Sequence, residues 1–325
     1  MTAPKTLAAD GALRGDATPA GAGLPRVGVW TALRGDPMFW VGFALVVLVV
    51  GVAVLAPVLA PFDPNHQFRR EGLAATGDPL GPGPKFLLGT DRTGRDYLSR
   101  LMFGARTSIT IALVANGIAT LIGVAVGSIA AYAGSPQVRI PLTRRYVGLP
   151  VEAVLMRLTD LALSFPALLL AIALAAVVGA SIGSVILIIG AILWASLSRI
   201  VYGRVRVIRS AAFVEGARAL GASSPDILLR HILPHLVPLV VVYAALGIAA
   251  TVLFETALSY LGAGVPGPTA TWGTMIADHI SWYATDPRLV LLPGVAIMLT
   301  VLGFSLLGDA IRDALDPRSW SARSR

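Results

Sequence analysis

The sequence predicts an all-α fold, a polytopic membrane bundle of six transmembrane helices with a helical loop on the cytoplasmic side. Hydrophobic residues make up 55% of the 325-residue chain, charged residues only 14%, and the mean hydropathy is +0.75. A soluble domain needs more charge to cover its surface. The apolar residues also gather in uncharged runs about as long as the ~20 residues that cross a bilayer as a helix.

Polar segments with glycine and proline breakers separate these runs. The uncharged stretch over residues 161–198 is too long for one span, so we place a turn in the glycine-rich residues 179–183 and infer two spans. Pro166 falls inside the first of them and predicts a kink. The six spans are expected at about residues 39–61, 109–133, 159–179, 182–202, 235–261 and 289–308.

Two terminal segments flank the predicted transmembrane domain of residues 38–308. Residues 1–37 are rich in Ala, Gly, Pro and Thr without periodicity, which predicts a disordered tail. The first apolar run starts too far from Met1 and is too long for a cleaved signal peptide, so we expect a permanent span. Residues 309–325 are expected to form a charged C-terminal tail.

The distribution of Lys and Arg predicts the orientation. Six spans place both termini on one side, where the tails and loops carry 18 basic residues against eight on the other side. Because basic loops stay in the cytoplasm, both termini are expected to be cytoplasmic. The outer segment 63–106 is itself basic and weakens this asymmetry. The net charge of +8 is explained by the same loops, so no nucleic-acid partner is inferred.

The most informative polar segment is the predicted cytoplasmic loop over residues 203–234. Phe213, Ala217 and Leu220 recur at helical spacing and form one apolar stripe. Gly221 is expected to end this helix because glycine tolerates the left-handed cap. An ordinary solvated loop rarely needs an apolar helical face, so a docking surface is favoured.

A second short helix is expected after Gly221. Ser224 would be its N-cap, Pro225 its first helical residue, and Asp226 the acid of its first turn. Pro234 is expected to stop it before the fifth span. The loop is therefore predicted to hold two short helices joined at a glycine.

The loop resembles a family signature. Glu215 to Gly221, followed by Leu233 and Pro234, is similar to the EAA…G…LP pattern of permease subunits of ATP-binding-cassette (ABC) importers, with Gly216 in place of alanine. In that family the loop is the coupling helix that docks on the ATPase subunit. The resemblance implies this set of coupling residues: Glu215, Gly216, Ala217, Leu220, Gly221, Pro225, Leu233 and Pro234.

Four further blocks resemble a narrower group, the dipeptide/oligopeptide (and nickel) permeases, and within it the C-type subunit. They occur in the family's order over roughly residues 40–318. The blocks are Leu88–Asp96 with Ser99–Leu101 and Gly104–Arg106, Met156–Asp160 with Phe165–Leu169, Ser259–Val265 with Trp272–Gly273, and Leu307–Asp309 with Arg312–Arg318.

The resemblance implies a multi-pass subunit in the cytoplasmic (inner) membrane of a bacterium, in contact with the lipid bilayer. Its expected partners are a sister permease in a heterodimer, two ABC ATPases and an extracytoplasmic substrate-binding protein. The chain itself is expected to bind no cofactor and to have no catalytic residues. ATP and Mg²⁺ would be used by the ATPase subunits, since the sequence has no Gly-Lys-Ser/Thr phosphate loop.

Three charged residues lie within or beside the spans, and two roles are possible for one of them. Glu255 lies inside the fifth span, where a charge is by default a candidate for the translocation pathway. The alternative is a buried glutamate bonded to a neighbouring helix. Arg157 and Asp160 are three residues apart on one helix face and are expected to form a structural pair.

Other chemistry is not supported by the sequence. His231 and His235 have the spacing of zinc ligands, but Pro234 lies between them and no glutamate base accompanies them, so no metal site is expected. The chain has no cysteine. Gly127 and Ser128 lack a nucleophile-elbow context and are expected to allow close helix packing.

Two other functions fit the sequence less well. An ion- or proton-coupled secondary transporter would use Glu255, but such carriers tend to show internal repeats that this sequence lacks. An intramembrane protease would need a nucleophile and base, and none is recognised. The substrate stays open, because dipeptides, oligopeptides, nickel chelates and other solutes share this permease frame.

Overall fold

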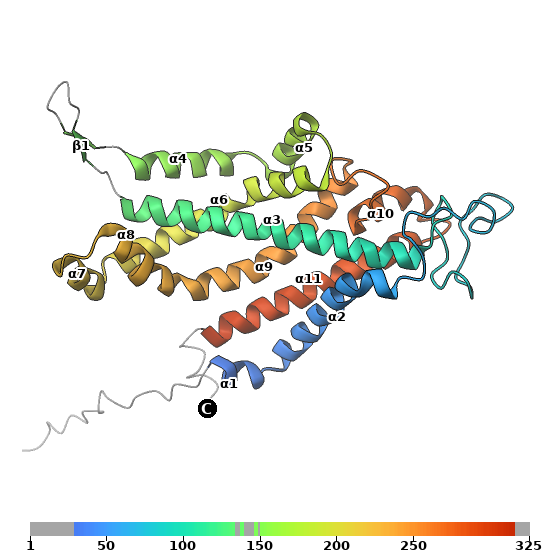
Figure 1. Cartoon of the computed structure of the whole chain (residues 1–325), viewed down its shortest axis with the longest axis horizontal. Helices are drawn as coiled ribbons and strands as arrows, with labels where there is room; N and C mark the ends of the chain where they lie inside the picture. The colour runs from blue at the N-terminus through green and yellow to red at the C-terminus, as the bar shows by residue number, and fades with distance from the viewer. Residues whose placement is uncertain (1–28, 134–136, 140–145, 149, 316–325) are drawn as a thin grey trace, which may run out of the picture.

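The computed structural model describes residues 29–133, 137–139, 146–148 and 150–315, which form a bundle of long helices (Figure 1). Five of the helices are long and apolar enough to cross a membrane. They are α2 (Pro37–Leu59), α3 (Tyr97–Ala133), α6 (Ile182–Arg209), α9 (Leu233–Tyr260) and α11 (Arg288–Leu315). These helices confirm the predicted fold class and correspond to five of the six predicted spans.

The predicted third span is broken rather than continuous. It consists of α4 (Val151–Ser164) and α5 (Ala167–Val178), which meet at an angle of 91°. Pro166 has no backbone N–H to continue the helix, and Phe165 before it is forced into an extended conformation with φ −93° and ψ 139°. The position of the kink was therefore predicted, but its size was not. The chain has six spans only if this bent pair counts as one.

Helix α3 is longer than predicted. It starts at Tyr97 instead of residue 109 and reaches about 55 Å at 1.5 Å per residue, well beyond a ~30 Å hydrocarbon core. The helix continues beyond the predicted span into a segment that Arg100 and Arg106 had suggested was a polar loop. Arg100 is in fact buried and lies 3.3 Å from the carboxylate of Asp91.

The ends of the chain also differ from expectation. The predicted disordered tail of residues 1–37 is wrong for its last part, because α1 (Val29–Arg34) is a short helix. Asp36 then caps α2 by accepting a hydrogen bond from the Met38 amide at 2.9 Å. At the other end α11 runs to Leu315, into the predicted tail of residues 309–325. Residues 1–28 and 316–325 lie outside the described part of the chain.

Short elements connect the long helices. Strands β1 (Gln137–Arg139) and β2 (Tyr146–Gly148) form an antiparallel pair in the loop before α4, which an all-α prediction did not include. Residues 60–96 form turns and loops at the end of the bundle opposite α7, joined there by α10 (Trp272–His279) and the 3₁₀ turn η2 (Ile280–Trp282) (Figure 1).

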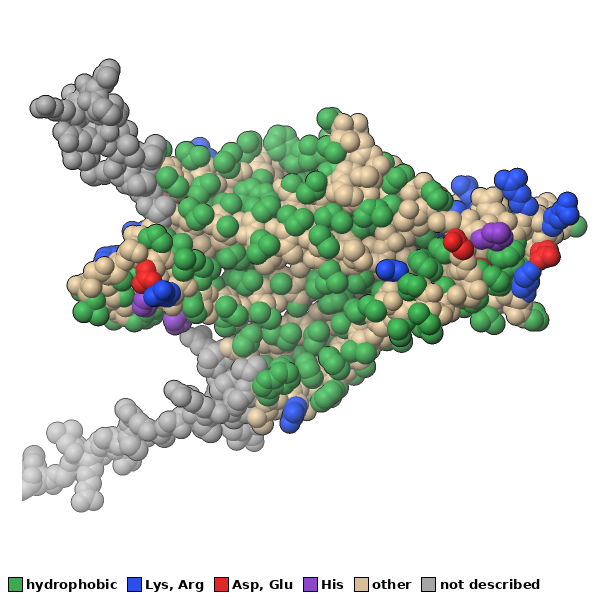
Figure 2. Space-filling model, viewed as in Figure 1, with side chains coloured by type: hydrophobic (Ala, Val, Ile, Leu, Met, Phe, Trp, Pro, Cys, Tyr) green, Lys and Arg blue, Asp and Glu red, His purple; other side chains and the backbone are tan. Residues whose placement is uncertain are grey.

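Small residues let the helices pack closely, as the sequence predicted for Gly127. A Cβ atom on Gly127 would lie 2.9 Å from the Cβ of Val201 on α6, so only glycine fits between α3 and α6. On the outside, apolar side chains cover the middle of the bundle and charged side chains gather at its ends (Figure 2). This is the surface expected of a protein that lies in a bilayer.

Candidate functional site

The predicted docking loop folds into two short helices at one end of the bundle. The first is α7 (Ala212–Ala219), and the second begins as α8 (Ser224–Asp226) and continues through the π-helix η1 (Ile227–Ile232) into α9. The predicted loop of residues 203–234 starts later than expected, because α6 continues to Arg209, and we call residues 210–234 the docking loop. In Figure 1 its helices project from the ends of α6 and α9.

The turn between the two helices depends on Gly221. Its φ is +84°, in the left-handed region that side chains with a Cβ rarely adopt. The amide of Gly221 donates to the carbonyl of Arg218 at 3.0 Å, and the amide of Ala222 donates to the carbonyl of Ala217 at 3.1 Å. These two bonds are the Schellman motif, which satisfies the last carbonyls of a helix. The predicted glycine cap is confirmed.

The docking loop rests on a buried apolar base. Val214, Ile227 and Ile232 are at most 1% exposed and belong to one cluster with Val205 and Ile208 of α6. Arg209, the last residue of α6 before the loop, links that helix to α3, because its Nη1 donates to the carbonyl of Ala131 at 3.0 Å. The loop thus packs against the ends of α3, α6 and α9. A displacement of the loop would therefore displace the ends of these helices.

The outward face of the loop carries most of the predicted coupling residues. Leu220 is 91% exposed and Phe213 is 45% exposed, while Ala217 between them is partly buried. The predicted stripe therefore points largely to solvent, and Val214 is the residue that packs inward. Exposed side chains or backbone are also found at Glu215, Gly216, Gly221, Pro225 and Pro234, whereas Leu233 is partly buried.

Two details of the predicted second helix are wrong. Its N-cap is Ser223, whose Oγ accepts from the Asp226 amide at 3.4 Å, and Ser224 is already the first helical residue. Pro234 does not stop the helix, since the backbone stays helical from Ser224 to Tyr260. The π-helix just before Pro234 explains this: its wider turn accommodates a residue that cannot donate a helical hydrogen bond.

Comparison with known families identifies the family of the chain. Residues 123–321 match the family model described as "Binding-protein-dependent transport system inner membrane component", and residues 25–75 match "N-terminal TM domain of oligopeptide transport permease C". The chain belongs to the permease family of binding-protein-dependent ABC importers. Within that family it groups with the C-type subunits of the peptide/nickel permeases.

Individual relatives agree with this assignment. The permease is 35% identical over 289 residues to the "Glutathione transport system permease protein GsiD" of Escherichia coli O6:K15:H31 and to that of Shigella boydii serotype 4, covering 89% of each chain. Its fold is similar to a chain in a solved structure titled "Inward facing conformations of the MetNI methionine ABC transporter", with a TM-score of 0.53 and 16% identity. That match covers 67% of the permease and 97% of the other chain. A self-contained secondary transporter is thereby set aside.

Glu255 of the permease is enclosed by protein. It is 0% exposed, and its Oε1 accepts a hydrogen bond from Ser259 Oγ at 2.7 Å. Ser108 of α3 donates a longer bond of 3.4 Å to Oε2 and accepts from the Trp272 amide of α10 at 3.2 Å. The carboxylate therefore connects α9, α3 and α10. This geometry favours the structural alternative over a residue that faces a transport cavity.

The predicted pair of Arg157 and Asp160 is replaced by a different pair. Asp160 forms its ion pair with Arg199 of α6. Among the described residues Arg157 takes part in no ion pair, and its side chain is exposed on α4. The sequence spacing identified a partner on the same helix, but α6 packs against α4 and brings Arg199 closer.

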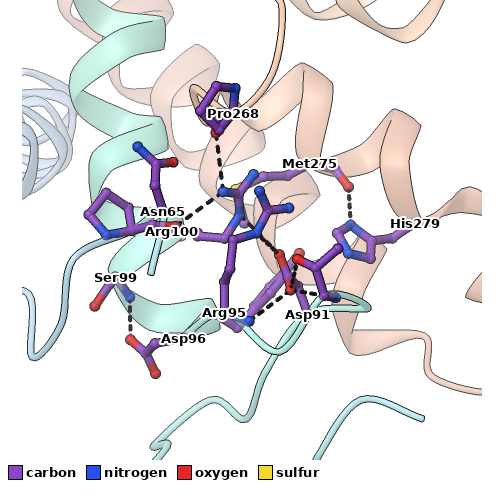
Figure 3. Close-up of polar contacts among 12 residues, drawn as sticks. Asn65, Asp91, Arg95, Asp96, Ser99, Arg100, Pro268, Met275 and His279 are labelled. Carbon is purple, nitrogen blue, oxygen red and sulfur yellow. Dashed lines mark hydrogen bonds and ion pairs between the residues drawn. The ribbon is translucent and has the colours of Figure 1, made fainter. Parts of the chain in front are cut away.

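A buried charged cluster at the other end of the permease was not predicted (Figure 3). Asp91 is 0% exposed and accepts hydrogen bonds from the Arg95 amide at 2.9 Å and from Arg95 Nε at 2.6 Å. Arg100 lies beside it, and its Nη1 donates to the carbonyls of Pro64 at 3.2 Å and Pro268 at 3.3 Å. Arg100 thus ties the segment before α3 to the loop after α9. We call Asp91, Arg95 and Arg100 the Asp91 cluster.

Burial and neighbouring charges both shift the pKa values of the residues in and beside this cluster. Desolvation by burial acts to raise the pKa of Asp91, but the Arg95 amide and the charges of Arg95 and Arg100 outweigh it, so the pKa lies below its usual value. Burial also lowers the pKa of the nearby His279, whose Nδ1 donates to the Met275 carbonyl at 2.7 Å. The sequence block that contains Asp91 was recognised, but nothing in its spacing indicated burial.

Proposed function

We propose that this permease is one half of the membrane channel of an ATP-driven importer for di- or oligopeptides. A sister permease would form the other half, two ABC ATPases would bind the cytoplasmic ends, and an extracytoplasmic binding protein would deliver the substrate. ATP and Mg²⁺ would be used by the ATPases alone. Both termini would lie in the cytoplasm, as the basic loops predict.

The docking loop is the observation that carries this proposal. Its face is exposed at Leu220, yet its base is buried at Val214, so it presents a fixed apolar surface that the described residues do not cover at Leu220. A fixed apolar helix face of this kind suits a groove on a partner protein.

The same loop offers a route for coupling. Helix continues without interruption from Ser224 through α9 to Tyr260. A displacement of the turn at Gly221 would therefore move α9 as a lever, and the contacts of α7 with α6 would move that helix too. In the proposed cycle the ATPases close on ATP, shift the two docking loops and change which side of the membrane the pathway faces.

A peptide substrate is supported by two similarities. The first span matches a segment named for oligopeptide transport, and the relatives reported above are named for glutathione, which is itself a tripeptide. Specificity would reside largely in the binding protein, so the permease residues alone do not select among peptides.

Copurification tests the proposal. A tagged permease with Leu220→Asp should insert normally but recover less ATPase than wild type, because a charge replaces the most exposed apolar side chain of the docking face. Leu229→Asp is the matched control, since Leu229 is also 61% exposed but lies on the second helix away from the turn. Unchanged ATPase recovery and peptide uptake with Leu220→Asp would refute docking at this face.

Reporter fusions test the orientation separately. Fusions at residues 75 and 220 should report the periplasm and the cytoplasm, respectively. A cytoplasmic signal at residue 75 or a periplasmic signal at residue 220 would reverse the orientation and exclude the docking loop as the ATPase site.

A further inference from the structure

A small cavity with charged walls lies at the end of the permease opposite the docking loop. Its volume is 290 Å³, and it is bounded by α10, the loop of residues 262–269 and the segment that leads into α3. We call it the outer pocket. Arg95 and Arg100 of the Asp91 cluster line it, and so does Asp278 of α10. Charges of both signs therefore face one small cavity.

The two arginines bring more positive charge to the outer pocket than their shared partner neutralises. Arg95 is 8% exposed and Arg100 is 1% exposed, and the Nε atoms of both pair with Oδ2 of Asp91, at 2.6 Å and 3.3 Å. The two guanidinium groups lie next to each other beside Asp91 (Figure 3). Within the described residues, neither Nη atom of Arg95 donates a hydrogen bond, and Nη2 of Arg100 donates none. These N–H groups can therefore receive a carboxylate, the group that a guanidinium binds best.

Asp278 presents the opposite charge to the same cavity. Its side chain is half-buried, and across the described part of the chain it forms no hydrogen bond and no ion pair. It is thus unpaired with Arg95 and Arg100, although all three line the outer pocket. Opposite charges that share a cavity without touching suit a ligand that carries both, with its anionic group at the arginines and its cationic group at the aspartate.

The size and the wall of the outer pocket narrow the choice of ligand. A volume of 290 Å³ is at the lower limit of the ~300–1,000 Å³ of small-molecule pockets, so it suits a ligand of about the size of a dipeptide. A Cβ atom on Gly262 or Gly267 would meet nothing within 4 Å, so the wall is bare backbone at both residues. Such a wall lets the main chain of a ligand approach closely.

We propose that the outer pocket binds both charged termini of a short peptide, with the carboxylate at Arg95 and Arg100 and the ammonium at Asp278. The site would serve the proposed peptide importer, on which this assignment rests, and would hold the peptide at the extracytoplasmic end of the permease. Termini are common to all short peptides, so selection among side chains would stay with the binding protein. Longer peptides, whose termini are too far apart to reach both charges, would not be held in this way.

Equilibrium binding of tritiated Ala-Ala to the assembled importer, purified with its ATPases and without the binding protein, tests the proposal. Asp278→Asn should weaken binding about tenfold, equivalent to about 1.4 kcal/mol, because the charge that faces the ammonium is lost. This variant breaks no bond among the described residues, so membrane abundance and ATPase recovery should stay normal. Asp78→Asn is the matched control, since Asp78 is an exposed acid at the same end that does not line the pocket. It should bind Ala-Ala as wild type does.

Ligand analogues test each terminus separately. N-acetyl-Ala-Ala lacks the ammonium and Ala-Ala amide lacks the carboxylate, so each should compete with labelled Ala-Ala about tenfold more weakly than unlabelled Ala-Ala does. Asp278→Asn should reduce the discrimination against N-acetyl-Ala-Ala and leave the discrimination against the amide unchanged. A merely structural role of Asp278 would instead weaken the binding of all three ligands alike.

Two further variants test the arginines and the space. Arg95→Lys keeps a positive charge beside Asp91 but loses the planar fork, so it should reduce the discrimination against Ala-Ala amide. Ala277→Phe places a ring in the outer pocket from α10 and should weaken Ala-Ala binding without changing any charge. Ala284→Phe is its control, because Ala284 is exposed at the same end and does not line the pocket.

Four results would overturn the proposal. They are the absence of Ala-Ala binding to wild type, equal competition by N-acetyl-Ala-Ala, equal competition by free alanine or acetate, and equal loss of binding with the two control variants. Any of these with intact ATPase recovery and peptide uptake leaves the proposed importer in place. Failure of wild type to recover ATPases or to take up peptide would count against the importer itself.

Discussion

The docking loop at one end of the permease and the Asp91 cluster at the other are both rich in arginine and acidic residues, but their exposure is opposite. Leu220 of the loop is 91% exposed, and its charged neighbours Glu215 and Arg218 face solvent. Asp91 and Arg100 are at most 1% exposed and form an ion pair, and Arg100 also donates hydrogen bonds to two backbone carbonyls. Both segments belong to family motifs.

This difference in exposure shows that a charged motif can serve either contact with a partner protein or stability of the fold. Exposed charges cost little to keep and are available to a partner, whereas buried charges are tolerated only when each has a partner within the same chain. A variant of the docking loop should therefore affect assembly and leave folding intact. A variant of the Asp91 cluster should affect folding first.

The largest expected effect follows from Asp91→Asn. The change leaves Arg95 and Arg100 buried without their carboxylate, and breaking a buried pair in this way costs about 3–5 kcal/mol. We expect low abundance in the membrane and a lower unfolding temperature in detergent. Asp78→Asn is the control, since Asp78 is exposed on the same segment and accepts only a local bond from Thr76. Equal abundance of both variants would contradict the structural role of the cluster.

The pH dependence of the unfolding temperature tests the same stabilising role of Asp91. Because the pKa of Asp91 in the folded state is below its usual value of 3.8, the ionised carboxylate stabilises the fold above that value. This contribution is lost as the pH falls through the lowered pKa. Unfolding temperatures of wild type should therefore drop on strong acidification, and the Asp91→Asn subunit should show a smaller drop over the same range.

A smaller effect, confined to assembly, is expected from Gly221→Val. A β-branched residue at φ +84° is strained by about 1–2 kcal/mol, so the second helix should be misdirected. Membrane abundance should stay normal. ATPase recovery and uptake should fall roughly 5- to 30-fold, because a strain of about 1–2 kcal/mol changes an equilibrium constant by that factor. Normal ATPase recovery would show that the turn does not set the docking geometry.

Glu215→Lys probes the same surface through charge. Glu215 is exposed on α7, so reversing its charge should leave the fold intact and reduce docking where the ATPase groove is complementary. We expect a loss of ATPase recovery up to about tenfold that shrinks at high salt. An effect that does not depend on salt would point to misfolding of α7 instead.

Glu255→Gln is expected to have little effect. The amide keeps the shape of the side chain, and the hydroxyls of Ser259 and Ser108 can turn to suit it, so the cost is about 1 kcal/mol at most. Uptake and ATPase recovery should stay within about twofold of wild type. Loss of uptake with full ATPase recovery would return Glu255 to the translocation pathway.

The smallest effect is expected from Gly216→Ala, which restores the residue of the family signature. A Cβ there meets nothing within 4 Å, so the alanine should stabilise α7 by up to about 1 kcal/mol. Gly221→Ala makes the same change where space is equally open but φ is positive, and should destabilise the turn. Opposite signs in thermal unfolding of the two variants would confirm that backbone conformation, not space, distinguishes these glycines.

Much of the fold was predictable because a bilayer restricts the chain strongly. A spanning helix must be about 20 residues long and apolar on all sides, so its position is visible in composition alone. The glycine cap of α7 was predictable for a similar reason, since the requirement for a positive φ is local. The start of α3 was not, because the sequence does not show that the charge of Arg100 is neutralised.

The sequence by itself determined that this chain spans a membrane, where its apolar helices lie and where the turn at Gly221 falls. These are local properties of composition and backbone. Only the tertiary structure decided that Asp160 pairs with Arg199 instead of Arg157, that Glu255 is enclosed and that the Asp91 cluster is buried. The partners of a charge come from helices distant in sequence, and the free energy of a charge depends on its burial, which the order of residues does not record.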